Sequence, residues 1–155
     1  SNPHMKGGFL GLDFKHTRAH LYRAVMEGIT YEYAYYLDVL RGLRPEEAWK
    51  EVLVVGGGAQ SNLFNQIKAD VLGVRSSTLM TGETALIGSG AVAGVSAGLL
   101  EDYAPPIRAA IQEGRRFEPD PVRHAAYAPY QAAYLDALER AGTYYRAHPL
   151  TGQAG

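Results

Sequence analysis

The sequence predicts an α/β fold in which a mostly parallel sheet is flanked by helices. Apolar, strand-like runs alternate along the chain with segments of helical periodicity, as is typical of a parallel sheet covered by helices. Residues 52–55 (VLVV) form a continuous apolar run, the pattern of a strand buried on both faces. With 155 residues, 46% hydrophobic and 20% charged, the chain can form one domain with its own core.

The first predicted elements are a short strand and a long helix. Phe9–Leu12 is an apolar run typical of a strand, and Asp13–His16 is a polar loop. Thr17 can cap a helix that runs to Arg41, with Gly42 as its C-terminal stop. Positions of helical spacing predict the core-facing stripe. The stripe comprises Leu21, Ala24, Val25, Gly28, Ile29, Glu32, Tyr36 and Val39.

The rest of the chain is expected to continue the alternation. The expected elements are a short helix at 45–51, the strand at 52–55, a helix capped by Ser61 and ended by Gly73, a weaker strand at 75–79, a small-residue helix at 84–100, a loop at 117–121 and a helix from about Pro129 to Arg146. Residues 84–100 form an uncharged stretch of 17 residues, which is at the lower limit of length for a membrane span. Their Gly, Ala and Ser content favours a buried helix instead, with the ridge Gly90, Gly94 and Gly98 packed beneath a ligand site.

Composition excludes several classes of protein. The net charge is −1 and no run of lysine or arginine occurs, so we expect no nucleic-acid partner and no membrane partner. The absence of cysteine excludes disulfides and thiolate metal sites and fits a cytoplasmic protein. Residues 1–5 (SNPHM) are interpreted as an expression-tag scar, and residues 6–155 as a single domain cut from a longer protein.

Three consecutive glycines, Gly56–Gly58, stand between the best strand and the helix capped by Ser61. Glycines there let a ligand approach the main chain, and the first N–H groups of a helix favour an anion. A tight turn with no ligand is the alternative. A Walker A loop is excluded because no lysine follows until Lys68. The dinucleotide fingerprint is disfavoured, because Ser61 stands at its last glycine and 75–80 (RSSTLM) offers no acidic residue.

Two blocks of residues give a better match. The first is a Gly-Gly-Gly-Ala turn followed by two helices; its residues are Gly56–Ala59, Gln66, Ala69, Asp70, Glu83, Thr84, Ala85, Gly88 and Ala91. The second lies in the amino-terminal part of the chain; its residues are Gly7, Phe9, Gly11, Leu12, His20, Leu21, Ala24, Val25, Met26 and Glu27. Together the two blocks resemble the carboxyl-terminal domain of the FGGY family of carbohydrate kinases, most closely its xylulose-kinase branch.

The resemblance implies a partial actin-like ATPase fold (ribonuclease H-like) that binds ATP. Gly57 and Gly58 would lie under the nucleotide, beside Ala59, and Gly11 would border the phosphates from a neighbouring strand end. Asn62 matches the position that reaches the adenine edge, and an amide both donates and accepts as a purine requires. Lys15 stands where glycerol-kinase-like relatives place glycine. A solvated loop lysine is the favoured interpretation, and a point-charge contact to a phosphate is the alternative.

The resemblance also implies what this segment lacks. The catalytic Asp, the phosphate-gripping loops, most of the Mg²⁺ site and the sugar-binding domain would lie upstream of Gly7. We therefore expect no catalytic residue and no metal ligand here, and an inactive fragment. Asp13 and Asp70 do not match the catalytic position. The alternative is a non-catalytic actin-like nucleotide-binding or assembly module. The sugar would be xylulose or a related sugar. A homo-oligomer formed through Phe9–Leu12 or a neighbouring strand is also expected.

Two other features carry less weight. His16 and His20 are four residues apart, as in some zinc sites, but no third ligand accompanies them. We expect His20 to be a hydrogen-bonded structural residue. The eleven tyrosines are expected to pack on helix faces rather than to stack on a sugar.

Overall fold

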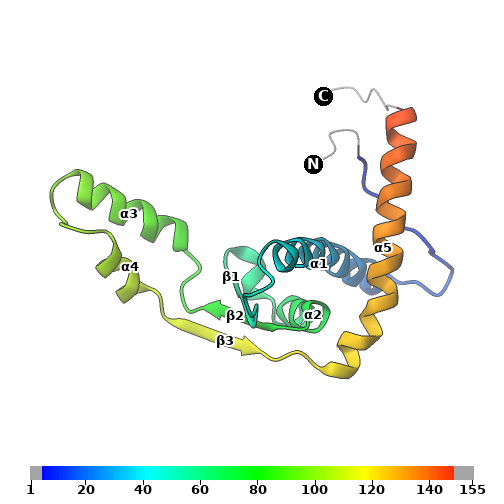
Figure 1. Cartoon of the computed structure of the whole chain (residues 1–155), viewed down its shortest axis with the longest axis horizontal. Coiled ribbons are helices and arrows are strands. Elements are labelled where there is room, and N and C mark those ends of the chain that lie inside the picture. The colour runs from blue at the N-terminus through cyan, green and yellow to red at the C-terminus, as the bar shows by residue number, and fades with distance from the viewer. Residues whose placement is uncertain (1–4, 149–155) are drawn as a thin grey trace.

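A three-stranded mixed sheet and two packed helices form the centre of the protein (Figure 1). The computed structural model describes residues 5–148. Its elements are α1 (Arg18–Leu43), β1 (Glu51–Val54), the 3₁₀ helix η1 (Gly57–Gln60), α2 (Asn62–Leu72), β2 (Arg75–Leu79), α3 (Thr84–Ser96), α4 (Ala104–Ala110), β3 (Glu113–Phe117) and α5 (Pro121–Ala147).

The sheet has the order β1-β2-β3 and only one of its two pairings is parallel. β1 and β2 pair in parallel, with Val52 opposite Ser76. β3 pairs antiparallel to β2, with an irregular register between Ser77 and Leu79. The prediction of a mostly parallel sheet missed β3, because its sequence EGRRF has no apolar run. The chain reverses through α3 and α4 before β3, and this reversal makes the second pairing antiparallel.

The helix predicted after Thr17 is confirmed, but its predicted buried face is wrong. The backbone N–H of Thr17 donates to Nδ1 of His20 at 3.1 Å, which confirms the structural role of His20. Val25 and Ile29 of the predicted stripe are at least 40% exposed. Apolar side chains occur around most of α1, so periodicity could not select the face that meets α2. The buried side chains of α1 are Met26, Thr30, Tyr31, Ala34 and Leu37.

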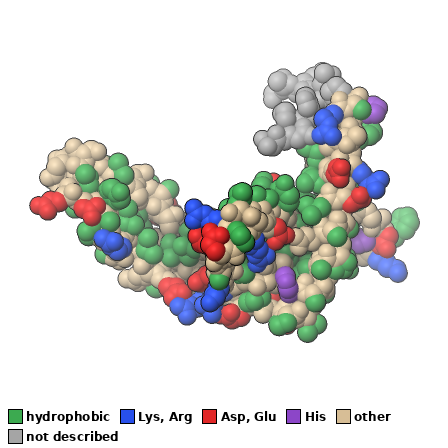
Figure 2. All heavy atoms as spheres, in the orientation of Figure 1, with side chains coloured by type: hydrophobic (Ala, Val, Ile, Leu, Met, Phe, Trp, Pro, Cys, Tyr) green, Lys and Arg blue, Asp and Glu red, His purple; other side chains and the backbone are tan. Residues whose placement is uncertain are grey.

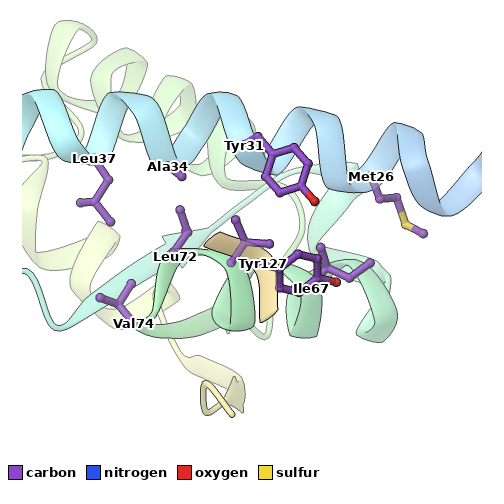
Figure 3. Close-up of a cluster of buried hydrophobic side chains, with 9 residues drawn as sticks. Met26, Tyr31, Ala34, Leu37, Ile67, Leu72, Val74 and Tyr127 are labelled. Carbon is purple, nitrogen blue, oxygen red and sulfur yellow. The ribbon is translucent and has the colours of Figure 1, made fainter. Parts of the chain in front are cut away.

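The core lies between α1, α2 and the start of α5. Figure 3 shows Met26, Ala34 and Leu37 directed from α1 toward α2. Tyr127 enters from α5, with its ring 6.2 Å from that of Tyr31 in an edge-to-face arrangement. This confirms that these tyrosines pack between helices. Burial of this cluster packs α1 and α5 against α2 and brings α1 and α5 into contact with each other.

Several other predicted elements differ from the structure. Residues 9–12 form no strand, because none of the described strands pairs with them, and Phe9 and Leu10 are exposed. The helix expected at 45–51 is absent, and turns lead there directly into β1. α4 was not predicted. α5 begins eight residues before Pro129, because Asp120 caps it by accepting from the N–H groups of Val122 and Arg123.

Helices α3 and α4 form an arm that projects away from the sheet (Figure 1). The expected burial of α3 is wrong, since Ala91 is its only buried residue. Figure 2 shows hydrophobic side chains on the surface of this arm. Leu86 and Val92 of α3 are exposed. Within the predicted ridge of small residues, Gly94 packs locally, because a Cβ on it would lie 2.7 Å from Leu100, whereas a Cβ on Gly90 or Gly98 would meet no atom within 4 Å. Within residues 5–148, no helix combines the length and apolarity needed to cross a membrane.

The carboxylate of Asp70 anchors α5 to α2. Asp70 is 3% exposed and accepts hydrogen bonds from Arg123 Nε at 2.7 Å, the backbone N–H of Asp120 at 2.9 Å and Gln66 Nε2 at 2.9 Å. Its own carbonyl oxygen lies 2.9 Å from Nδ1 of His124. Asp70 thus has a structural role that fixes the direction in which α5 leaves the sheet.

We predict that Asp70→Ala lowers the free energy of unfolding by about 3 kcal/mol, because several hydrogen bonds to a buried charge are lost together. Urea unfolding of the chain followed by circular dichroism measures the change. The matched control is Asp136→Ala, which removes an exposed pair with Arg140 and should cost under about 0.5 kcal/mol. Equal losses in the two variants would contradict the anchoring role.

Candidate functional site

The turn between β1 and α2 has a backbone that only glycine adopts readily. Gly56 has φ 79° and ψ −168°, so any other residue would be strained at this position. The chain then winds into η1, where the N–H of Ala59 donates to the carbonyl of Gly56 at 3.0 Å. Ser61 ends this turn and caps α2 by accepting from the N–H of Phe64 at 3.3 Å, which confirms its predicted role.

Two buried side chains of α2 bind the inner side of this turn. Asn65, fully buried, donates from Nδ2 to the carbonyl oxygen of Ala59 at 2.7 Å. Lys68, 3% exposed, places Nζ 3.5 Å from the carbonyl oxygen of Gly58 and 3.2 Å from Oδ1 of Asn65. Lys68 Nζ also lies 3.9 Å from the centre of the Phe64 ring. The carbonyl oxygens of Gly58 and Ala59 therefore face the protein interior.

The ammonium of Lys68 has no carboxylate partner among the described residues. Burial lowers its pKa from 10.5 to about 8. Its contacts are neutral: two oxygen acceptors and an aromatic face. A buried cation stabilised only in this way destabilises the folded state at neutral pH, because its lost hydration is incompletely replaced.

The outer side of the turn faces an open cavity of about 550 Å³. The turn and the start of α2 supply Gly56, Ala59, Gln60 and Asn62. The other walls come from the end of β2 and the loop after it, and from β3. These residues are Thr78, Leu79, Met80, Thr81, Gly82, Glu113, Gly114 and Arg115. The cavity lies at the carboxyl ends of the parallel strands β1 and β2, where α/β proteins bind ligands.

One hydrogen bond fixes the amide of Asn62 at the rim of this cavity. Arg115 Nη1 donates to Oδ1 of Asn62 at 2.6 Å. The amide oxygen is thereby occupied, and the amide NH₂ has no partner within residues 5–148. β3 also approaches β2 closely, since a Cβ on Gly114 would meet Thr78 Oγ1 at 2.7 Å.

The structure brings some of the predicted site residues together and separates others. Ala59 and Asn62 line the cavity. Gly57 lies in η1 beside them, whereas Gly58 lines a second cavity of about 460 Å³ between α1, β1 and α2. Gly11 lies in the loop before α1 and lines neither cavity. Contact of these five residues with a nucleotide stays a prediction.

Sequence reasoning missed two contributors to the cavity wall. Thr78–Gly82 comprise the end of the strand predicted at 75–79 and the loop after it, so the rule that ligands bind at the carboxyl ends of strands could have identified them. Arg115 had no comparable signal, because β3 was not predicted and its partner Asn62 is 53 residues away. No cluster of three or more metal-binding side chains occurs in the described part of the chain.

A third cleft, of about 490 Å³, lies between α1 and α5 and is lined by ionisable side chains. Arg23 Nη2 donates to the hydroxyl of Tyr127 at 2.9 Å, and that hydroxyl donates to Glu27 at 2.8 Å. Arg23 Nε also pairs with Glu27 at 2.7 Å. These groups satisfy one another, so the cleft is explained as a polar junction between two helices.

The comparisons with known proteins agree with this arrangement. The model of the FGGY family of carbohydrate kinases, C-terminal domain, matches residues 1–97. The chain belongs to this family. Xylulose kinase of Staphylococcus epidermidis is 30% identical over 130 residues, which are 84% of this chain and 26% of the relative. A glycerol kinase of Geobacter sp. is 37% identical over 125 residues, which are 79% of this chain and 24% of the relative. The chain therefore spans about a quarter of the length of these curated relatives.

Solved structures of FGGY kinases show that the fold is a partial actin-like ATPase fold. The structure of xylulose kinase from Rhodospirillum rubrum matches with a TM-score of 0.75 and 23% identity, over 94% of this chain and 29% of that one. That of gluconate kinase from Lactobacillus acidophilus matches with a TM-score of 0.71 and 22% identity, over 93% of this chain and 29% of that one. The predicted family and fold class are confirmed.

We predict that Gly56→Ala lowers the free energy of unfolding of this FGGY domain by roughly 1–3 kcal/mol, because alanine is strained at a φ of 79°. Gly57→Ala is the matched control. Gly57 has no positive φ, and a Cβ added to it would meet no atom within 4 Å, so that variant should be neutral or slightly stabilised. Thermal unfolding of both variants measures the difference, and a neutral Gly56→Ala would contradict it.

We also predict that the pH dependence of stability reports the buried charge of Lys68. The folded chain releases this proton near pH 8, while the unfolded chain holds it until about pH 10.5. Between these values the unfolded state binds more protons, so the free energy of unfolding gains up to about 1.4 kcal/mol per pH unit from this group. Urea unfolding at pH 7 to 10 should show this rise in the wild type relative to Lys68→Met, and parallel curves would contradict it.

Proposed function

We propose that this chain is the ATP-binding portion of a carbohydrate kinase that transfers the γ-phosphoryl group of ATP to a sugar hydroxyl. The observation that carries the proposal is the cavity in which the FGGY glycine turn and Asn62 face the carboxyl end of β2. Its volume of about 550 Å³ falls in the range of small-molecule sites. Membership of the FGGY family supports the same reaction class.

In this proposal the Asn62 amide reads the adenine edge. Arg115 occupies the amide oxygen, so the NH₂ group is left to donate to a ring nitrogen of the purine. Gly57, Gly58 and Ala59 provide the main chain on which the ribose and phosphates lie. Gly11 lines neither cavity, so its proposed contact with the phosphates requires the loop before α1 to approach the nucleotide.

The remaining parts of the kinase reaction belong to a longer protein in this proposal. Phosphoryl transfer requires a carboxylate to accept the proton of the sugar hydroxyl, Mg²⁺ on the phosphates, and an in-line geometry. None of the predicted site residues of this chain has those roles, and we propose that Mg²⁺ and the sugar are held mainly by the other part. The chain alone is then inactive, because positioning accounts for most of this catalysis.

The relatives support a finer proposal for the substrate. Xylulose or a related sugar is the proposed substrate, since a relative named xylulose kinase is 30% identical over 84% of this chain. The relatives named glycerol kinase are as similar, so the substrate class is a polyol or sugar hydroxyl.

We propose a cytoplasmic location, where ATP is available. A non-catalytic actin-like module remains the alternative, and a homo-oligomer remains a prediction.

We predict that Asn62→Ala, made in the full-length protein, weakens ATP binding by about tenfold, because the amide contact to the base is lost. Calorimetric titration with ATP gives the dissociation constant, and the KM for the sugar should stay unchanged. Leu63→Ala is the matched control, since Leu63 is the exposed neighbour that does not line the cavity. Unchanged ATP affinity in Asn62→Ala would contradict the assigned site. ATP binding without sugar-dependent release of ADP would favour the non-catalytic alternative.

A further inference from the structure

We propose that Lys68 and Asn65 are positioning residues for nucleotide binding, which hold the glycine turn from its buried side in the shape that the ligand requires. This inference rests on the proposed nucleotide function of the turn. It assigns a role to two side chains of α2 that do not line the cavity and that match none of the family motif positions.

The geometry separates the two sides of the turn. On the buried side, Asn65 Nδ2 donates to the carbonyl oxygen of Ala59 at 2.7 Å, and Lys68 Nζ lies 3.5 Å from the carbonyl oxygen of Gly58. The N–H groups of Gly57 and Gly58 have no hydrogen-bond partner among residues 5–148, so they remain available to a ligand. A run of glycines by itself is flexible, and two fixed carbonyls restrict it to one conformation.

The two side chains also hold each other. Lys68 Nζ lies 3.2 Å from Oδ1 of Asn65, so Asn65 accepts from the lysine and donates to Ala59 through its two amide atoms. The pair thus forms a continuous chain of contacts from α2 to the turn, and loss of either member releases one carbonyl. The ring of Phe64 closes one side of the ammonium at 3.9 Å.

Stability alone does not explain a lysine at this position. Its charge is buried without a carboxylate, whereas an apolar side chain of similar length would fill the same space without a desolvation cost. Within the described part of the chain, no acidic group lines the cavity beside Lys68. The only other ionisable groups there are the phenols of Tyr33 and Tyr36 from α1, and β1 contributes only apolar residues. A residue that opposes folding beneath a ligand-binding turn is typical of a functional site.

The test is Lys68→Met in the full-length protein, with Lys50→Met as the matched control because Lys50 is an exposed lysine immediately before β1. We expect Lys68→Met to raise the thermal unfolding midpoint at pH 7. In the absence of nucleotide, hydrogen exchange of the peptide spanning residues 56–60 should become severalfold faster. The dissociation constant for ATP should rise about tenfold, while the KM for the sugar stays unchanged. Lys50→Met should alter none of these quantities.

The readouts separate this inference from the proposed function. A lower unfolding midpoint in Lys68→Met, or unchanged exchange of residues 56–60, overturns the positioning role whether or not the protein binds ATP. Faster exchange with unchanged ATP affinity also overturns it. A wild-type protein that binds no ATP overturns the proposed function, while the exchange measurement still decides whether the lysine holds the turn. Lys68→Gln, which keeps a donor without the charge, should restore part of the exchange protection.

Discussion

The buried carboxylate of Asp70 is the interaction on which the arrangement of the fold depends. It accepts hydrogen bonds from α5 and from Gln66 within α2, and so joins two helices that are about fifty residues apart in sequence. With α5 fixed there, Tyr127 enters the core against α1. The residue after β3 is held at the same junction, because Gln66 Nε2 also donates to the carbonyl of Glu118. The end of β3, a strand that forms part of the cavity wall, is thereby tied to this anchor.

Helix α2 connects this anchor to the candidate site. Its last turn carries Asp70, its middle carries Asn65 and Lys68, and its first residue is Asn62, which faces the cavity. The polar side chains on its buried face bind backbone or charged groups, so α2 transmits the rigidity of the core to a glycine turn that has little rigidity of its own. One short helix thus serves both stability and the proposed ligand site.

The sequence predicted the elements with local signals and missed those without them. Thr17, Ser61 and Gly73 mark the ends of α1 and α2 through contacts within a few residues, and the structure confirms all three. The apolar run at residues 9–12 predicted a strand, but a strand needs a partner, and the described part of the chain supplies none. The prediction of the buried face of α1 was wrong for a related reason. Apolar residues occur on several faces of α1, so the neighbouring helix decides which face is buried.

The sequence by itself determined the family, the glycine turn and the placement of Asn62 one helical turn beyond it, because each is encoded in a short stretch whose chemistry does not depend on distant residues. Only the tertiary structure decided that Arg115 orients the Asn62 amide and that Asp70 anchors α5, since both contacts join residues more than fifty positions apart. It also decided that Lys68 is buried without a carboxylate, because burial is a property of the packed helices and strands around it.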